Sequence, residues 1–182
     1  CLADSVQYIN ISENNHSFKI SDDNYLSIIG KTDINNDNYD MLVSVDPYCS
    51  TFSFPIKKIA PYTFIKSTVR SIKCMPEEIG EKSFAHLTSL EEINLTLCKN
   101  IGKKAFIYSG IQYIEIPPFV TEIKESTFSE SNLSTIKFLG DSQLKKIGVS
   151  AFKKSKIKSI EIPKGVTEIA ETAFVDCKYE NS

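Results

Sequence analysis

Two segments of this chain decide its fold: IEIPPFVTEIKESTF at residues 114–128 and IEIPKGVTEIAETAF at residues 160–174. Each contains an isoleucine that is followed five residues later by a phenylalanine. The same Ile-x4-Phe pair occurs six times, and successive isoleucines are 20, 22, 22, 24 and 22 residues apart. The six pairs are Ile59 with Phe64, Ile79 with Phe84, Ile101 with Phe106, Ile123 with Phe128, Ile147 with Phe152 and Ile169 with Phe174. A fixed period of this length predicts a solenoid of stacked repeats.

A short strand is expected in every unit, because two apolar residues separated by one polar residue recur before each Ile-x4-Phe pair. The clearest examples are Ile93 with Leu95, Ile114 with Ile116, Ile136 with Phe138 and Ile160 with Ile162. A spacing of two places both side chains on one face of a strand. Pro117 and Pro163 follow two of these strands directly and should end them, because proline lacks the N–H that a ladder needs.

The residues from the isoleucine to the phenylalanine, such as IGKKAF at 101–106, form the return leg of each unit. This segment is too short for a full helix, so we expect one helical or 3-10 turn, or an irregular turn. Gly80, Gly102 and Gly148 follow three of the isoleucines and are interpreted as turn residues. One unit cannot bury its own apolar face, whereas stacked units bury a continuous core. The expected fold class is an α/β repeat solenoid with a parallel sheet of short strands on one face and these turns on the other.

These units resemble the BspA-like leucine-rich repeats, also described as the Treponema pallidum type, whose hallmark is an Ile-rich, Pro-punctuated unit with an Ile-x4-Phe core pair. The resemblance covers residues 51–177. It departs at Leu87–Leu90, where one residue is inserted, and at Met75–Ile79, where the loop is shorter. Cys177 occupies a position that is serine in other units, and Cys1 precedes its own strand at a similar place. We therefore expect the chain to be a fragment of a longer array.

Residues 1–50 follow the period less closely. Short strand steps are expected at Ile9–Ile11, Leu26–Ile28 and Val43–Val45, with the polar stretch 33–40 as a turn. We interpret residues 1–50 as an irregular N-terminal repeat or cap with hairpin-like strands, and residues 51–182 as repeats of about 22 residues. A separate N-terminal capping subdomain is the alternative.

Candidate chemistry is sparse, and we expect no enzyme, no cofactor and no metal site. His16 and His86 lack partners at ligand spacing, and the five cysteines contain no CxxC pair. Cys74 and Cys98 fall on inward positions, where a free cysteine behaves as a small hydrophobe. The Asp33-x-Asn35-x-Asp37 pattern lacks the later residues of an EF-hand, so an Asx-rich turn is favoured over a looser calcium site. No phosphate-binding or hydrolase motif occurs.

Net charge and hydrophobicity indicate which kinds of partner are disfavoured. The net charge of −2 does not favour nucleic acid, and no apolar run approaches the length of a membrane span. Four glycosylation triplets, beginning at Asn10, Asn15, Asn94 and Asn132, fit an extracellular eukaryotic protein but also arise by chance in chains of this composition.

The positions expected to point outward from the strands are the candidate partner-binding residues. They form two columns: Lys73, Asn94, Glu115, Lys137 and Glu161, preceded by Ser71, Glu92, Tyr113, Thr135 and Ser159. Either the columns are a solvated ladder that holds the register, or this sheet face receives a protein partner, as solenoid faces commonly do. Tyr113 is the best anchor candidate, because aromatic residues dominate binding hot spots.

The resemblance implies a non-enzymatic, protein-binding surface or secreted protein. BspA-like proteins are implicated in adhesion to host cells, to extracellular matrix or to other microbes. An intracellular protein-interaction scaffold is the alternative function.

Overall fold

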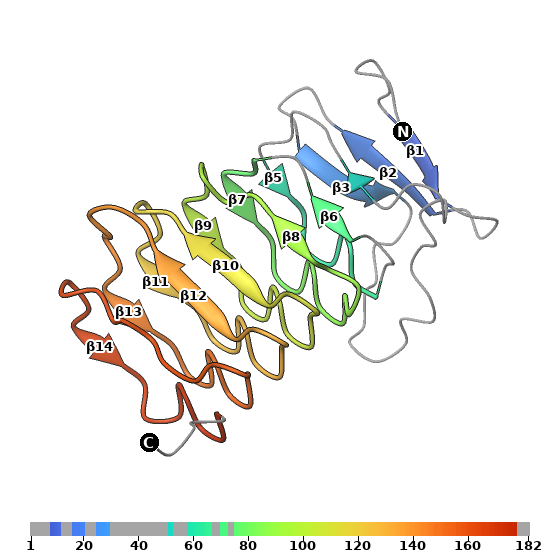
Figure 1. The fold of residues 1–182 in the computed structure, drawn as a ribbon. Helices are drawn as coiled ribbons and strands as arrows, with labels where there is room; N and C mark the ends of the chain where they lie inside the picture. Colours follow the sequence, from blue (N-terminus) through green and yellow to red (C-terminus); the bar gives the residue numbers. More distant parts are fainter. Residues whose placement is uncertain are drawn as a thin grey trace.

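A computed structural model describes residues 58–66, 70–72 and 75–177 in full, and elsewhere the backbone of four strands at 8–11, 16–20, 25–29 and 51–52. Within the fully described part, the chain winds through similar coils that stack side by side along one axis (Figure 1). The repeats form a β-solenoid whose strands pair in parallel, as the period predicted.

Each coil before the last contributes one short strand to each of two faces, and the last described coil contributes β14 alone. The first sheet contains β4 (Thr51–Phe52), β6 (Ser71–Ile72), β8 (Glu92–Ile93), β10 (Tyr113–Ile116) and β12 (Thr135–Phe138). The second sheet contains β5 (Lys58–Ile59), β7 (Glu78–Ile79), β9 (Asn100–Ile101), β11 (Glu122–Ile123), β13 (Lys146–Ile147) and β14 (Glu168–Ile169). Strands β4, β6 and β8 are hydrogen-bonded to one another, as are β10 and β12, but the described ladder is interrupted between β8 and β10 and between β9 and β11.

Three further strands lie in the first 50 residues: β1 (Tyr8–Ile11), β2 (His16–Ile20) and β3 (Tyr25–Ile29). They pair antiparallel to one another, and β3 then pairs in parallel with β5. One sheet therefore runs from β1 to β9. The expected strand at Val43–Val45 lies outside the described residues, and a domain boundary at residue 50 stays a prediction.

The return legs are chains of tight turns rather than helices. In the leg after β9, the N–H groups of Ala105, Ile107 and Ser109 donate to carbonyls three residues back, while those of Lys104, Phe106 and Tyr108 donate to the next coil. Lys104 and Tyr108 have φ values of +56° and +55°. Left-handed residues four positions apart, such as Lys104 and Tyr108, interrupt any helical path. The fold is thus a β-solenoid, and irregular turns replace the helical turns that an α/β class would require.

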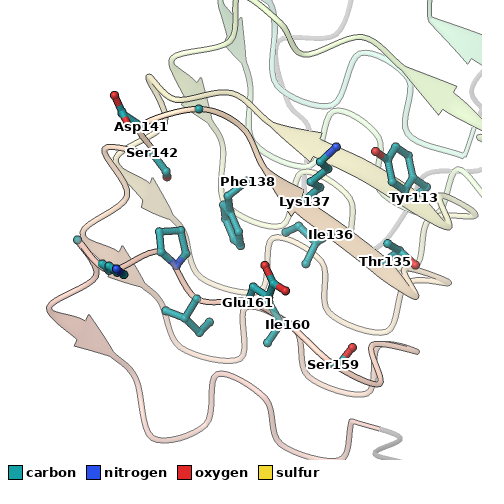
Figure 2. A pocket seen from close by; sticks show the side chains of 15 residues that line it. Tyr113, Thr135, Ile136, Lys137, Phe138, Asp141, Ser142, Ser159, Ile160 and Glu161 are labelled. Carbon is teal, nitrogen blue, oxygen red and sulfur yellow. The ribbon is translucent and has the colours of Figure 1, made fainter.

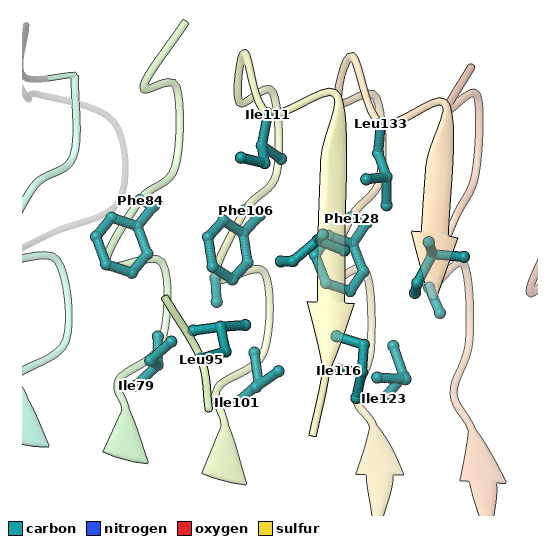
Figure 3. Packing of buried hydrophobic residues seen from close by; sticks show 14 of the residues in the cluster. Ile79, Phe84, Leu95, Ile101, Phe106, Ile111, Ile116, Ile123, Phe128 and Leu133 are labelled. Carbon is teal, nitrogen blue, oxygen red and sulfur yellow. The ribbon is translucent and has the colours of Figure 1, made fainter. Parts of the chain in front are cut away.

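The core follows the predicted columns. Figure 3 shows the rings of Phe84, Phe106 and Phe128 lying face to face between the two sets of strands. Phe64, Phe84, Phe106, Phe128, Phe152 and Phe174 form one stack, with adjacent centroids 5.0–5.5 Å apart. The spacing follows from the repeat, because the same ring projects from the same place in adjacent coils. Cys98 lies in this core, fully buried, whereas Cys74 lies outside the described residues.

The glycines permit close approach of coils rather than left-handed turns. A Cβ added to Gly102 would lie 2.5 Å from the backbone nitrogen of Glu81 in the preceding coil. The left-handed positions of the return legs are occupied by other residues, such as Lys104 and Tyr108. Gly102 and Gly148 do begin turns, because their carbonyls accept from the N–H groups of Ala105 and Ala151. At Gly102 the absence of a side chain is also needed for packing between coils.

Candidate functional site

The candidate site is the outer face of the first sheet. Eight of the ten predicted partner-binding residues are exposed there: Glu92, Asn94, Tyr113, Glu115, Thr135, Lys137, Ser159 and Glu161. Lys73 lies outside the described residues. Ser71 departs from the expectation, because it is only 7% exposed. Its hydroxyl donates to Glu92 Oε1 at 2.5 Å, since parallel pairing places Glu92 directly beside it.

A polar cluster of Tyr113, Glu115 and Lys137 occupies the middle of this face. The Tyr113 hydroxyl donates to Glu115 Oε1 at 2.5 Å, and Lys137 Nζ lies 3.9 Å from the same oxygen. The hydrogen bond to the carboxylate raises the pKa of Tyr113, with smaller contributions from desolvation and charge. The register pairs Glu115 with Lys137, so the predicted column is correct for this pair. Both side chains are exposed, so the pair adds little to stability.

Two grooves flank this cluster. The central groove, of about 380 Å³, lies between β8 and β10, and its wall includes Glu92, Asn94 and Glu115. The C-terminal groove, of about 740 Å³, lies between β12 and residues 159–165. Tyr113 lines both grooves and remains 48% exposed. Large exposed aromatic side chains beside concave surfaces are typical of binding sites.

Both grooves open beside an IEIP segment, at 114–117 and at 160–163, and in each segment the proline lacks a backbone donor. Where β10 and β12 do pair, the N–H of Leu139 donates to the carbonyl of Ile116 at 2.9 Å. Pro117 and Pro163 occupy the position of Leu139 in their own coils and have no N–H to donate. Sequence reasoning expected these prolines to end strands along the chain, but missed that they also weaken pairing with the preceding coil.

The C-terminal groove has an apolar floor and a polar rim. Figure 2 shows Ile136 and Phe138 of β12 on one side and Ile160 of the last coil on the other. Lys137 and Glu161, both exposed, belong to the rim. The loop at 140–142 contributes a further polar wall. This loop lies outside the repeat pattern, so no repeat position predicts its place beside the groove.

The second sheet presents charged residues instead. Lys58 pairs with Glu78 at 3.4 Å, and Lys146 pairs with Glu168 at 2.8 Å. These ion pairs join equivalent positions of adjacent coils. Such solvated pairs support register rather than form a site.

The described residues offer little catalytic chemistry. His86 is exposed and its ring stacks on Tyr108 with centroids 4.6 Å apart. Burial raises the pKa of the Cys98 thiol to about 12, so it is a poor nucleophile. In the described ranges, no group of three or more His, Cys, Asp or Glu residues is placed to hold a metal ion. Nor does this part of the chain contain a helix long and apolar enough to cross a membrane.

A sequence model of the BspA type leucine rich repeat region matches residues 56–180 in six copies. The chain therefore belongs to the BspA-type leucine-rich-repeat family, and leucine-rich-repeat domains are protein-interaction modules as a class. No curated protein matches it.

Two solved structures match this chain, and the first of them has a similar fold. A leucine rich cell surface protein from Faecalibacterium prausnitzii has a TM-score of 0.52 and 22% identity, covering 96% of this chain and 53% of its own. A leucine-rich repeat protein from Eubacterium ventriosum has a TM-score of 0.41 and 18% identity, covering 94% of this chain and 63% of its own. This chain thus spans about half the length of the first of these proteins.

Proposed function

We propose that this chain is a non-enzymatic protein-binding module of a cell-surface or secreted protein, and that it contacts host cells, extracellular matrix or other microbes. The observation that carries the proposal is the exposed ring of Tyr113 between two grooves on an otherwise regular sheet face. Membership of the BspA-type family supports binding as the kind of activity.

The partner would meet the exposed columns of the first sheet. Tyr113 supplies apolar area with a polar tip, and Glu115 holds that tip in place through a hydrogen bond. A side chain held before binding loses less conformational entropy when the complex forms. Glu92, Asn94, Thr135, Lys137, Ser159 and Glu161 would form the surrounding polar contacts; we include Lys73 by its place in the column, and Ser71 as support for Glu92.

The direct test measures binding of the purified chain to a panel of extracellular-matrix proteins, together with antibody staining of intact cells. Tyr113→Ala should weaken binding at least tenfold without lowering the melting temperature. Tyr108→Ala is the matched control, because Tyr108 is also exposed and donates to a glutamate, Glu130, but lies on a return leg. Equal effects of the two variants would contradict the assigned face. Staining only after permeabilisation would favour the intracellular scaffold.

A further inference from the structure

We propose that the C-terminal groove binds an extended peptide segment of the partner by strand addition, with the peptide pairing along the free edge of β12. The inference rests on the proposed function, because it names the kind of partner segment that part of the same face would take. It depends on three observations: unpaired backbone, an apolar floor and a charge pattern on the rim.

The backbone of β12 is paired on one edge only. On its β10 side, the N–H of Thr135 donates to Gln112 and the N–H of Leu139 donates to Ile116. Among the described residues, no backbone hydrogen bond joins β12 to residues 159–162. A strand edge of this kind is the surface to which an extended peptide adds.

Backbone pairing with the preceding coil is missing at residues 159–162 but is present elsewhere in the last coil. The N–H of Thr167 donates to the carbonyl of Lys145 at 2.9 Å, and that of Phe152 donates to Ala173 at 2.8 Å. The last coil is therefore attached through the second sheet and through its return leg. Pro163 has no N–H with which this segment could pair with β12. The groove therefore lies between β12 and residues 159–162, and each of these is held in place by other contacts.

The apolar floor of the groove is complementary to a peptide that has apolar side chains at every second position. Ile160 and Ile162 line this groove and are half-buried, as are Val166 and Phe174 elsewhere in the last described coil. Phe138 is also half-buried and lines the same groove. A strand with apolar residues two apart would place both of them on this floor, in the manner of the chain's own repeats.

The charges on the rim favour a neutral residue between the two apolar residues of the peptide. Lys137 and Glu161 occupy equivalent positions on opposite walls, and Lys137 already lies near Glu115. A charged residue inserted between them would face an opposite charge on one side and a like charge on the other, so attraction and repulsion largely cancel and its desolvation is not offset. The expected segment is therefore aliphatic, neutral polar, aliphatic, as in Val-Thr-Val.

The probe is a fluorescein-labelled peptide, Gly-Ser-Val-Thr-Val-Ser-Gly, added to the whole chain. Fluorescence anisotropy should show saturable binding, and amide hydrogen exchange should show protection of Ile136 and Phe138. A peptide N-methylated at the central threonine keeps every side chain but loses one backbone donor. It should bind about tenfold more weakly. Equal binding of the two peptides, or no binding, would overturn strand addition.

Pro163→Val supplies the missing N–H and should close the groove. In this variant the amides of Ile136 and Phe138 should be protected without peptide, and peptide binding should weaken. Pro117→Val is the matched control, since it alters the same motif at the central groove and should leave peptide binding unchanged. If the two amides are already protected in the unaltered chain, the groove is closed in solution and the proposal fails.

The outcomes separate this proposal from the function on which it rests. Loss of peptide binding with a persisting effect of Tyr113→Ala on matrix binding would remove only strand addition. Conversely, peptide protection of β12 without any matrix binding would contradict the assigned type of partner and leave the groove as a peptide site.

Discussion

The rings of Phe106 and Phe128 stack with their centroids 5.3 Å apart and their planes inclined by 13°. Both rings are fully buried and each has a further phenylalanine on its other side. The stack runs through every fully described coil, so each coil packs against the next through a pair of phenylalanine rings. Loss of an interior ring should therefore disturb two coil interfaces at once.

Phe106→Ala should lower the free energy of unfolding by about 3–5 kcal/mol, because it removes a large buried side chain and leaves a cavity. Phe174→Ala should cost less, since Phe174 is half-buried and ends the described stack. Urea denaturation followed by circular dichroism measures both. Equal losses would show that the interior rings are not packed more tightly than the last one.

The left-handed return legs predict an unusual response to glycine. Lys154 is exposed and has a φ of +53°, where a β-branched side chain is strained. Lys154→Val should therefore be less stable than Lys154→Gly by about 1–2 kcal/mol. Lys156 is the control position, because it is exposed and has no positive φ. At Lys156 the valine variant should be as stable as the glycine variant, or more stable. The same order at both positions would contradict the left-handed assignment.

The buried thiol of Cys98 should resist alkylation in the folded chain. Its pKa is raised from 9.0 to about 12, mainly by desolvation. Iodoacetamide at pH 8, with peptide mapping by mass spectrometry, should label Cys177 before Cys98, because Cys177 is only half-buried. Labelling of Cys98 as fast as Cys177 would contradict its place in the core.

The same shift makes stability depend on pH in the alkaline range. A raised folded pKa means that the folded state holds the proton more tightly, so this contribution is complete below about pH 9 and is lost as the pH rises toward about 12. Cys98→Ala should flatten this part of the decline in unfolding midpoint. An unchanged slope would show that other groups cause the decline.

The ion pair between Lys137 and Glu115 should matter for binding and not for folding. Both side chains are exposed, so Lys137→Met should change stability by less than about 0.5 kcal/mol. Partner binding should nevertheless weaken and lose part of its salt dependence. A large fall in the melting temperature would instead assign the pair a structural role.

The repeat, the parallel stacking and most of the core can be predicted from the amino-acid pattern alone. Six Ile-x4-Phe pairs at a nearly constant period require equivalent residues to lie above one another, and apolar residues at those positions must be buried together. The same reasoning placed Cys98 inside, because it stands at a repeat position that is otherwise aliphatic, and Tyr113 outside, because alternate residues of a strand face opposite sides.

How adjacent coils join could not be predicted from the repeat and becomes visible in the folded chain. The burial of Ser71 depends on Glu92 of the next coil, and the turns of the return legs depend on carbonyls such as that of Glu125, which accepts from Lys104. At the two grooves, Pro117 and Pro163 lack the N–H with which the equivalent Leu139 joins its coil to Ile116 of the preceding one. A repeat pattern names which residues are equivalent; whether each donor finds its acceptor depends on contacts between coils, which one unit's sequence does not contain.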